Sequence, residues 1–288
     1  MPLLPVEQIE RIAPVFKGKF GNASARFLRW LLSIRKLSDI YDSIDENRGA
    51  EFAGKLLEKL GVNYLLGGSR RLSSLPDGPF ITVSNHPYGG IDGVILIDLI
   101  GHLRPGFKVM VNEFLSVIEA LTPSLIVVNP KNDLNNRTTA KNVQGVREVL
   151  SRLHDGEPVG FFPSGAVSDL SLKEMKIRDR EWQEAVIRLI AKARVPVVPV
   201  RFFDHNSFWF YNLGLIDWRV RLLQLPHELV NKKHRRLRVG VGETISVEEQ
   251  LRHPDINDFG LFLREKVYGM PLPDDFVRYG NFIASTRK

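Results

Sequence analysis

The sequence predicts an α/β protein with a mainly parallel central sheet flanked by helices. Short apolar segments rich in Val, Ile and Phe begin near residue 63 and alternate with longer segments of helical periodicity, a pattern typical of strands joined by helices. The strand candidates are apolar at almost every position rather than at every second one, which indicates a sheet that is covered on both faces. These observations favour one large domain, preceded by helices and followed by a short tail.

Three regions follow from the change of pattern along the chain. We assign residues 1–72 to an N-terminal helical segment, 73–250 to the α/β domain and 251–288 to a tail of helix and loop. In the first region, residues 23–41 place aromatic and aliphatic side chains near helical spacing, edged with Arg and Lys. Such a helix either packs on the domain or lies with its apolar face in a membrane surface. A second helix, at about 48–60, ends at a glycine, which favours a helix stop.

The strand candidates share near-continuous apolar character, and they are 63–66, 80–84, 107–111, 125–128, 159–162, 195–200 and 237–241. The helix candidates between them share helical periodicity, and they are 93–103, 137–153 and 181–193. Four consecutive aromatic residues at 208–211 fit either an irregular segment with some rings exposed or a buried strand.

The composition excludes several kinds of site and leaves two classes of partner. The 288 residues contain no cysteine, so a disulfide framework, a zinc–thiolate site and a thiol nucleophile are excluded. With 40 Lys and Arg against 33 Asp and Glu, the net charge of +7 suits phospholipid headgroups or nucleic acid. No stretch approaches the ~18 consecutive apolar residues of a membrane-spanning helix, and no secretory signal pattern opens the chain. We therefore expect a cytoplasmic protein, peripheral on the inner face of the cell membrane.

The segment Ile81–Gly93 is the strongest candidate for a catalytic site. It reads as an apolar strand, a turn with Pro and two Gly, and an Asp that opens an apolar helix, and ligands bind at such places in open α/β sheets. His86 is suited to take a proton near neutral pH, while Asp92 is suited to fix its tautomer and to stabilise the charged ring. Such a pair deprotonates a substrate hydroxyl. The alternatives are a helix N-cap role for Asp92 and a core role for His86.

Asn85-His86 followed by Asp92 resembles the catalytic block of the glycerolipid and lysophospholipid acyltransferases. Those enzymes commonly have four residues between the His and the Asp, whereas five separate them here. Gly89 and Gly90 absorb the difference, because glycine adopts loop conformations closed to other residues. The form is similar to a bacterial branch often labelled haemolysin-like, which is associated with acylation of lyso-ornithine and glycine-type lipids. By this resemblance the helices at 1–72 correspond to a membrane-docking motif.

Further blocks follow in the order that this family requires. Phe162-Pro163-Ser164-Gly165 stands where the family usually has Phe-Pro-Glu-Gly, and Val167 replaces the Arg that follows. The resemblance implies that this block binds substrate. Because the Glu and the Arg are missing, it favours a non-standard acceptor and leaves lyso-aminolipids and lysophospholipids such as lysophosphatidic acid as the candidates. The other positions that the resemblance assigns to substrate binding are Asn85, Lys131, Arg137 and Pro199. Arg178 belongs to a basic run after this block, which either holds an acyl-carrier protein, coenzyme A phosphates or an anionic headgroup, or is a solvated face.

The implied reaction moves a fatty acyl chain from acyl-carrier protein or coenzyme A to the hydroxyl of a lysolipid. The implied partners are that thioester, the lysolipid and a membrane surface with anionic lipids, with no cofactor, no metal ion and no nucleic acid. We expect the acyl chain near Val197–Val200 and oxyanion stabilisation by backbone N–H groups at 162–165. Under this interpretation the aromatic run at 208–211 is a lipid-facing lip or a wall of the acyl tunnel.

Two alternatives stay open. A lipid ester or thioester hydrolase needs the same activated oxygen chemistry, although no Gly-x-Ser-x-Gly pattern surrounds Ser164. A nucleic-acid-binding protein is suggested by the basic cluster Lys232–Arg236, which shows no recognition motif. The histidines show no paired spacing typical of zinc sites.

Overall fold

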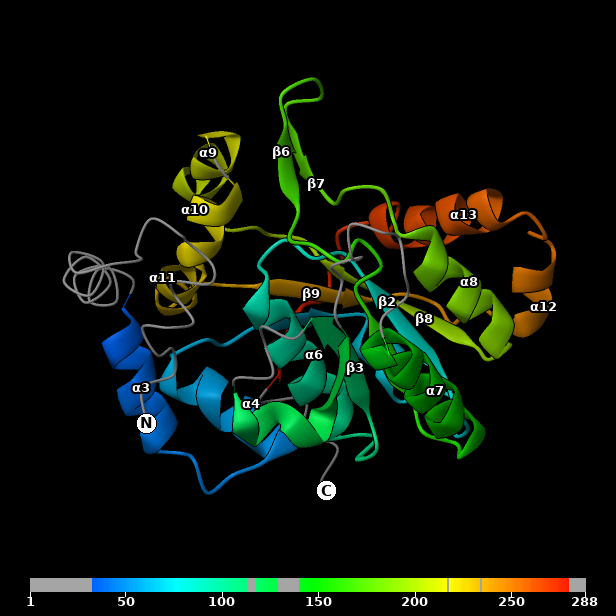
Figure 1. Ribbon diagram of the computed structural model, residues 1–288, viewed down its shortest axis with the longest axis horizontal. Coiled ribbons are helices and arrows are strands. Elements are labelled where there is room, and N and C mark those ends of the chain that lie inside the picture. Colours follow the sequence, from blue (N-terminus) through cyan, green and yellow to red (C-terminus); the bar gives the residue numbers. More distant parts are fainter. Residues whose placement is uncertain (1–32, 113–117, 129–139, 217, 234, 280–288) are drawn as a thin grey trace.

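The computed structural model describes residues 33–112, 118–128, 140–216, 218–233 and 235–279. These residues form an eight-stranded sheet of order β10-β1-β9-β8-β2-β5-β3-β4, with helices on both faces (Figure 1). The five neighbouring strands from β8 to β4 run parallel, and antiparallel pairing within this sheet joins β8 to β9 and β1 to β10. The predicted fold class is confirmed.

The strands of the main sheet are β1 (Leu65–Gly67), β2 (Ile81–Ser84), β3 (Lys108–Asn112), β4 (Leu125–Val128), β5 (Val159–Phe161), β8 (Val197–Phe202), β9 (Arg238–Val241) and β10 (Val277–Arg278). A separate hairpin consists of β6 (Asp169–Ser171) and β7 (Lys176–Arg178). The described helices are α3 (Ile34–Asp42), α4 (Gly49–Lys59), α5 (Ser69–Leu72), α6 (Gly90–Gly101), the 3-10 helix η3 (Glu119–Ser124), α7 (Ala140–His154), α8 (Glu184–Ala193), α9 (Phe208–Ile216), α10 (Trp218–Leu223), α11 (Leu225–Val230), α12 (Val247–Leu251) and α13 (Ile256–Tyr268).

Each face of the sheet has its own apolar core. On one face α4 and α6 pack together, and Phe52 and Ile97 belong to the same buried cluster as Val198 of β8. On the other face α7, α8 and α13 cover a second cluster, to which β2 contributes Ile81 and Val83. Because both faces are covered, the central strands are apolar at nearly every position, as the sequence pattern indicates.

Two predicted elements differ from the structure. The helix predicted to begin at Gly93 begins at Gly90 as α6, so Asp92 is not the N-cap; Gly89 holds that position. The aromatic run is neither an irregular segment nor a strand but the start of α9. Successive helical residues point about 100° apart, so Phe208 and Trp209 are exposed while Phe210 and Tyr211 are buried. The β6–β7 hairpin and α10, α11 and α12 were not predicted.

The predicted three-region division remains a prediction. β1, which precedes residue 73, and β10, which follows residue 250, both pair within the main sheet. Most of the predicted helix at 23–41 lies outside the described residues, and α3 begins at Ile34. Within the described part of the chain, we find no helix with both the length and the apolar character to cross a membrane.

A buried polar cluster anchors α6, the helix that carries Asp92. Asp98 accepts a hydrogen bond from Tyr64 at 2.9 Å, and its carbonyl oxygen accepts one from Tyr279. The His102 Nδ1 atom lies 3.2 Å from an Asp98 carboxylate oxygen, and Nε2 lies 3.5 Å from Glu51. The hydrogen bond that His102 donates to the Asp98 carboxylate raises the pKa of His102 from 6.5 to about 9, although burial of the ring opposes this.

We expect His102 to make the stability of the protein depend on pH. Because the folded-state pKa is raised above the unfolded value of about 6.5, the stabilisation is fully present below pH 6.5 and is lost as the pH rises through about 9. His102→Gln should therefore lower the free energy of unfolding by roughly 1–3 kcal/mol at pH 6 and by much less above pH 9. Urea unfolding of both proteins across this range measures the effect. A difference that stays constant with pH would contradict it.

Candidate active site

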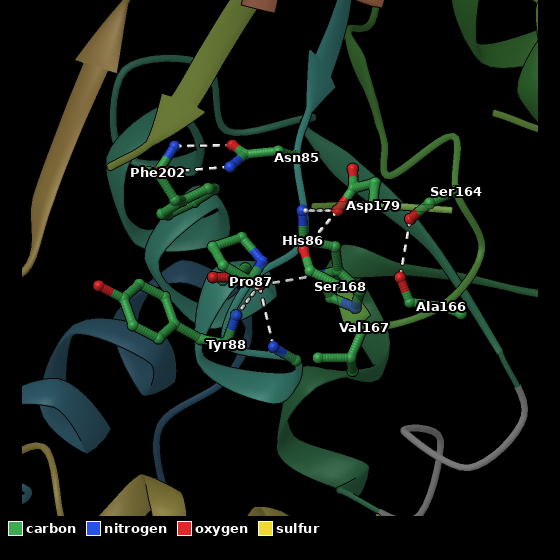
Figure 2. Close-up of polar contacts among 12 residues, drawn as sticks. Asn85, His86, Pro87, Tyr88, Ser164, Ala166, Val167, Ser168, Asp179 and Phe202 are labelled. Atoms are coloured by element: carbon green, nitrogen blue, oxygen red, sulfur yellow. Dashed lines mark hydrogen bonds and ion pairs between the residues drawn. The ribbon is translucent and has the colours of Figure 1, made fainter. Parts of the chain in front are cut away.

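The carboxyl ends of three neighbouring parallel strands form the site. β2 lies between β8 and β5, in a register that pairs Ser84 with Val200 and Val83 with Phe161. The residues that follow β2 and β5, together with Phe202 at the end of β8, therefore meet at one edge of the sheet. Figure 2 shows His86, Phe202 and the 164–168 segment around this point. The position agrees with the rule that ligands bind at the carboxyl ends of such strands.

Asn85 ties β2 to β8 at this edge. Its side-chain amide donates to the Phe202 carbonyl at 2.8 Å and its oxygen accepts from the Phe202 N–H at 2.8 Å (Figure 2). The side chain is buried, and these two contacts use both ends of the amide. The assignment of Asn85 to substrate binding stays a prediction, and the contacts that the structure shows for it position the loop that carries His86.

His86 and Asp92 form the pair that the sequence predicts. The His86 Nδ1 atom lies 2.9 Å from Asp92 Oδ2, and the Asp92 carboxylate is fully buried whereas the His86 side chain is 15% exposed. Asp92 Oδ2 also accepts the backbone N–H groups of Tyr88 and Gly89, at 2.9 and 3.0 Å. Burial raises the pKa of Asp92, and the hydrogen bonds from His86 and the two amides oppose that shift. Because Nδ1 faces Asp92, Nε2 is the ring nitrogen that remains for a substrate proton.

The glycine turn explains how five intervening residues still bring the pair together. Gly89 adopts φ +83, in the region that favours glycine, and it is the N-cap of α6. A Cβ at this position would lie 2.8 Å from Leu225 and 3.1 Å from Val167. The turn therefore requires glycine both for its backbone conformation and for the space around it.

Side-chain and backbone groups from distant segments hold the backbone of the His86 loop. The His86 N–H donates to Asp179 Oδ1 at 3.1 Å, and the His86 carbonyl accepts from the Ser168 N–H at 2.9 Å. The Pro87 carbonyl accepts from the Tyr211 hydroxyl at 2.7 Å, and the Tyr88 carbonyl accepts from Asn206 at 3.1 Å. The loop is thus bonded on both its amide and carbonyl sides, which fixes the imidazole relative to Asp92.

The chain is similar to known proteins along most of its length. A family model described as acyltransferase matches residues 9–273. The chain belongs to the acyltransferase family. A lyso-glycine lipid O-acyltransferase of Phocaeicola vulgatus is 26% identical over 272 residues, covering 90% of this chain and 93% of that protein. A lyso-glycine lipid O-acyltransferase of Bacteroides thetaiotaomicron is 26% identical over 251 residues, covering 84% and 88%.

A solved structure also aligns with this acyltransferase along most of its length. The 1-acyl-sn-glycerophosphate (LPA) acyltransferase from Thermotoga maritima has a TM-score of 0.47 and 16% identity, covering 92% of this chain and 93% of that chain.

The Phe162–Gly165 segment of the acyltransferase contacts His86 through the Phe162 ring. The Phe162 ring lies 4.3 Å from the His86 ring, centroid to centroid. Ser164 is buried and its hydroxyl donates to the Ala166 carbonyl, while the Pro163 carbonyl accepts from Gln183. The N–H of Gly165 is bonded to the Phe162 carbonyl at 2.9 Å. The segment thus supports His86, and of the N–H groups expected to stabilise an oxyanion, that of Gly165 is already engaged.

The remaining predicted positions do not gather around His86 in the described residues. Arg178 is exposed on β7 and lies 3.5 Å from Glu174. Pro199 is buried within β8, and Val197, Val198 and Val200 are fully buried beside it, so the expected acyl-chain contact at this strand stays a prediction. Lys131 and Arg137 lie outside the described residues.

The basic cluster at 232–236 is not a uniform surface patch. Lys232 is buried and bonds Glu228 at 2.6 Å, so its charge faces the interior rather than an anionic partner. No group of three or more His, Asp or Glu side chains in the described part of the chain is arranged to hold a metal ion.

Asp179 is the site residue that sequence reasoning missed. It is buried, and Oδ1 accepts hydrogen bonds from the His86 N–H and, at 2.5 Å, from the Ser168 hydroxyl. Oδ2 lies 3.3 Å from the Trp182 indole N–H. Asp179 thereby joins the His86 loop to the segment after β5. Its position beyond a hairpin, far from His86 in sequence, gives no local signal.

We expect Asp179→Ala to lower kcat by roughly 10- to 100-fold, because a small displacement of the catalytic base is costly. Since Asp179 positions the loop and takes no proton, the pH profile should keep its shape and KM should change little. Asp179→Asn retains an accepting oxygen and should restore much of the rate. Asp274→Ala, at an exposed Asp, is the matched control. Steady-state kinetics across pH test this, and an Asp179→Ala rate equal to that of the control would contradict it.

Proposed function

We propose that this acyltransferase transfers a fatty acyl chain from a thioester to the hydroxyl of a lysolipid, with a lyso-glycine lipid as acceptor. The observation that carries the proposal is the buried His86–Asp92 pair at the carboxyl ends of the central strands. The two curated relatives, which match most of this chain, are named lyso-glycine lipid O-acyltransferases. Their names support the acceptor class, and the pair supplies the chemistry.

The pair accounts for each proton and bond of the reaction. His86 Nε2 accepts the proton of the acceptor hydroxyl as its oxygen attacks the thioester carbonyl carbon. Asp92 keeps Nδ1 protonated and stabilises the imidazolium that forms. When the tetrahedral intermediate collapses, the C–S bond breaks, and the imidazolium returns its proton to the departing thiolate. An ester and a free thiol result, without a covalent acyl-enzyme.

The segment after β5 supports an acceptor that lacks a phosphate monoester. Where the resembling enzymes have Glu and Arg, this chain has Ser164 and Val167, and both side chains are buried. The Ser164 hydroxyl already bonds the Ala166 carbonyl. The segment therefore offers no cation for a phosphate, which favours the singly charged glycine headgroup over lysophosphatidic acid. Acyl-carrier protein and coenzyme A are the two thioester donors proposed.

Acyl transfer from labelled acyl-carrier protein and labelled acyl-coenzyme A to a panel of lysolipids tests the function. The panel contains lyso-glycine lipid, lyso-ornithine lipid and lysophosphatidic acid, with wild type and His86→Ala compared on each. We expect a His86-dependent diacyl product that forms fastest with lyso-glycine lipid. Release of free fatty acid without diacyl product would instead identify a hydrolase, and equal rates on lysophosphatidic acid would overturn the acceptor class.

A further inference from the structure

The β6–β7 hairpin and α9 project from the same side of the molecule, beside the active site. Both rise above the main sheet in Figure 1. At their bases Leu170 and Ile177 of the hairpin pack against a small buried cluster that contains Val167, Phe210 and Tyr211. Tyr211 is also the residue whose hydroxyl bonds Pro87 in the His86 loop. The two projections are therefore built onto the catalytic loop itself.

Large apolar side chains are exposed on both projections. At the hairpin tip Leu172 is 62% exposed and Met175 is 74% exposed. On α9 and α10 the exposed members are Phe208, Trp209, Leu215, Ile216 and Trp218. Seven of the twelve exposed large apolar side chains in the described residues lie on the hairpin, α9 and α10. Such clustering marks an interaction site, because scattered single residues are the ordinary case.

The charges and the residue types around this surface fit an anionic bilayer. Exposed cationic residues adjoin the apolar tip residues in sequence: Lys173 at the tip, and Lys176 and Arg178 on β7. Glu174 is the acidic residue among them. Long cationic side chains reach headgroups while neighbouring apolar side chains enter the acyl boundary. Trp is favoured at this boundary because its ring is amphipathic.

We propose that the β6–β7 hairpin tip and the exposed face of α9 and α10 form one membrane-docking surface, which enters the headgroup layer of an anionic bilayer next to His86. The inference rests on the proposed function in that the acceptor hydroxyl belongs to a membrane lipid. Docking on this surface brings the His86 loop to the depth at which a lysolipid presents its headgroup. The proposed surface consists of elements that follow the catalytic loop in sequence.

Vesicle co-sedimentation of the full chain tests the surface. The vesicles contain phosphatidylcholine and phosphatidylglycerol in equal parts, and the binding is measured in a His86→Ala background so that turnover plays no part. Leu172→Glu/Met175→Glu and Trp209→Glu/Ile216→Glu should each weaken vesicle binding by about tenfold or more. The matched control is Leu251→Glu/Leu261→Glu, on α12 and α13, to the right of the hairpin in Figure 1, where the side chains are 61% and 66% exposed. That variant should bind as the parent does.

The outcomes separate the docking surface from the proposed function. Unchanged vesicle binding in both test variants overturns the docking surface, even if wild type acylates lysolipids. Loss of vesicle binding in the test variants alone supports it, even if no lysolipid is acylated and the proposed function fails. If the same variants keep vesicle binding but lose binding to acyl-carrier protein in gel filtration, the surface is a protein interface and the proposal is wrong.

Discussion

Asp92→Asn should lower kcat by about 10²-fold or more, and Asp92→Ala by about 10³- to 10⁴-fold. Three donors converge on Asp92 Oδ2, namely the Tyr88 and Gly89 amides and the His86 ring. An Asn at this position must keep its oxygen toward the two amides, since its NH2 group would oppose them. It therefore still orients the imidazole, but it no longer supplies the negative charge that stabilises the imidazolium. Ala removes both the charge and the orientation.

A second buried aspartate on the same helix provides the control. Asp98 is also buried in α6, but it bonds Tyr64 and His102 rather than His86. Asp98→Asn should lower the free energy of unfolding and leave kcat within about threefold of wild type, since it does not touch the base. Acyl-transfer kinetics, with circular dichroism to show that each variant folds, measure both effects. An Asp92→Asn enzyme that folds and keeps a kcat within tenfold of wild type would rule out the pair as the catalytic base.

The sequence revealed the His86–Asp92 pair because the two residues are close in the chain. His86 and Asp92 lie on either side of a single glycine turn, so strand, turn and helix signals place them together without tertiary information. The residues that hold the loop arrive from elsewhere: Asp179 follows the hairpin, and Asn206 and Tyr211 follow β8. Their roles depend on packing between elements, which no local pattern encodes.

The fold was predictable to a similar extent and for a similar reason. Buried parallel strands such as β4 and β5 contain no polar side chain, and their limits in the structure differ by at most one residue from the predicted ones. The β6–β7 hairpin has three-residue strands in a segment rich in charge, so it shows neither alternation nor an apolar run. The four aromatics at the start of α9 show no helical periodicity, because the two positions that face solvent are as apolar as the two that are buried.

Asn85 shows how a correct motif leaves the role of a residue open. The family resemblance predicts a substrate contact for the residue before the catalytic His, and that prediction still stands untested. In the structure both ends of its amide bond the backbone of Phe202, across 117 positions of sequence. Replacing Asn85 would remove the two bonds that join the carboxyl ends of these strands. The substitution would therefore displace the loop that carries His86, even if Asn85 makes no contact with substrate. Position within a motif identifies the site, whereas the contacts define what each member does.

Lys232→Ala should cost about 3–5 kcal/mol of unfolding free energy, the largest stability loss that we expect. Lys232 and Glu228 are both buried and bonded at 2.6 Å, and Glu228 also accepts the Ser207 N–H at 3.1 Å at the start of α9. Burial acts to raise the pKa of Glu228, but the Lys232 charge and the hydrogen bonds from Lys232 and Ser207 outweigh it and hold that pKa below its usual range. Without the lysine, the carboxylate is left buried beside apolar surroundings.

The double variant Lys232→Met/Glu228→Gln separates the cost of an unpaired charge from the net value of the pair. It keeps the side-chain volume and leaves an acceptor for Ser207, so it should lose far less stability than Lys232→Ala, because replacing a whole buried ion pair is often close to neutral. Lys233→Ala, at the exposed neighbouring lysine, is the control and should change stability by less than about 0.5 kcal/mol. Urea unfolding measures all three. The Lys232 ammonium also lies 5.4 Å from the centre of the Tyr88 ring, in the His86 loop. A Lys232→Ala protein as stable as Lys233→Ala would show that Lys232 is solvated rather than buried, and would contradict the prediction.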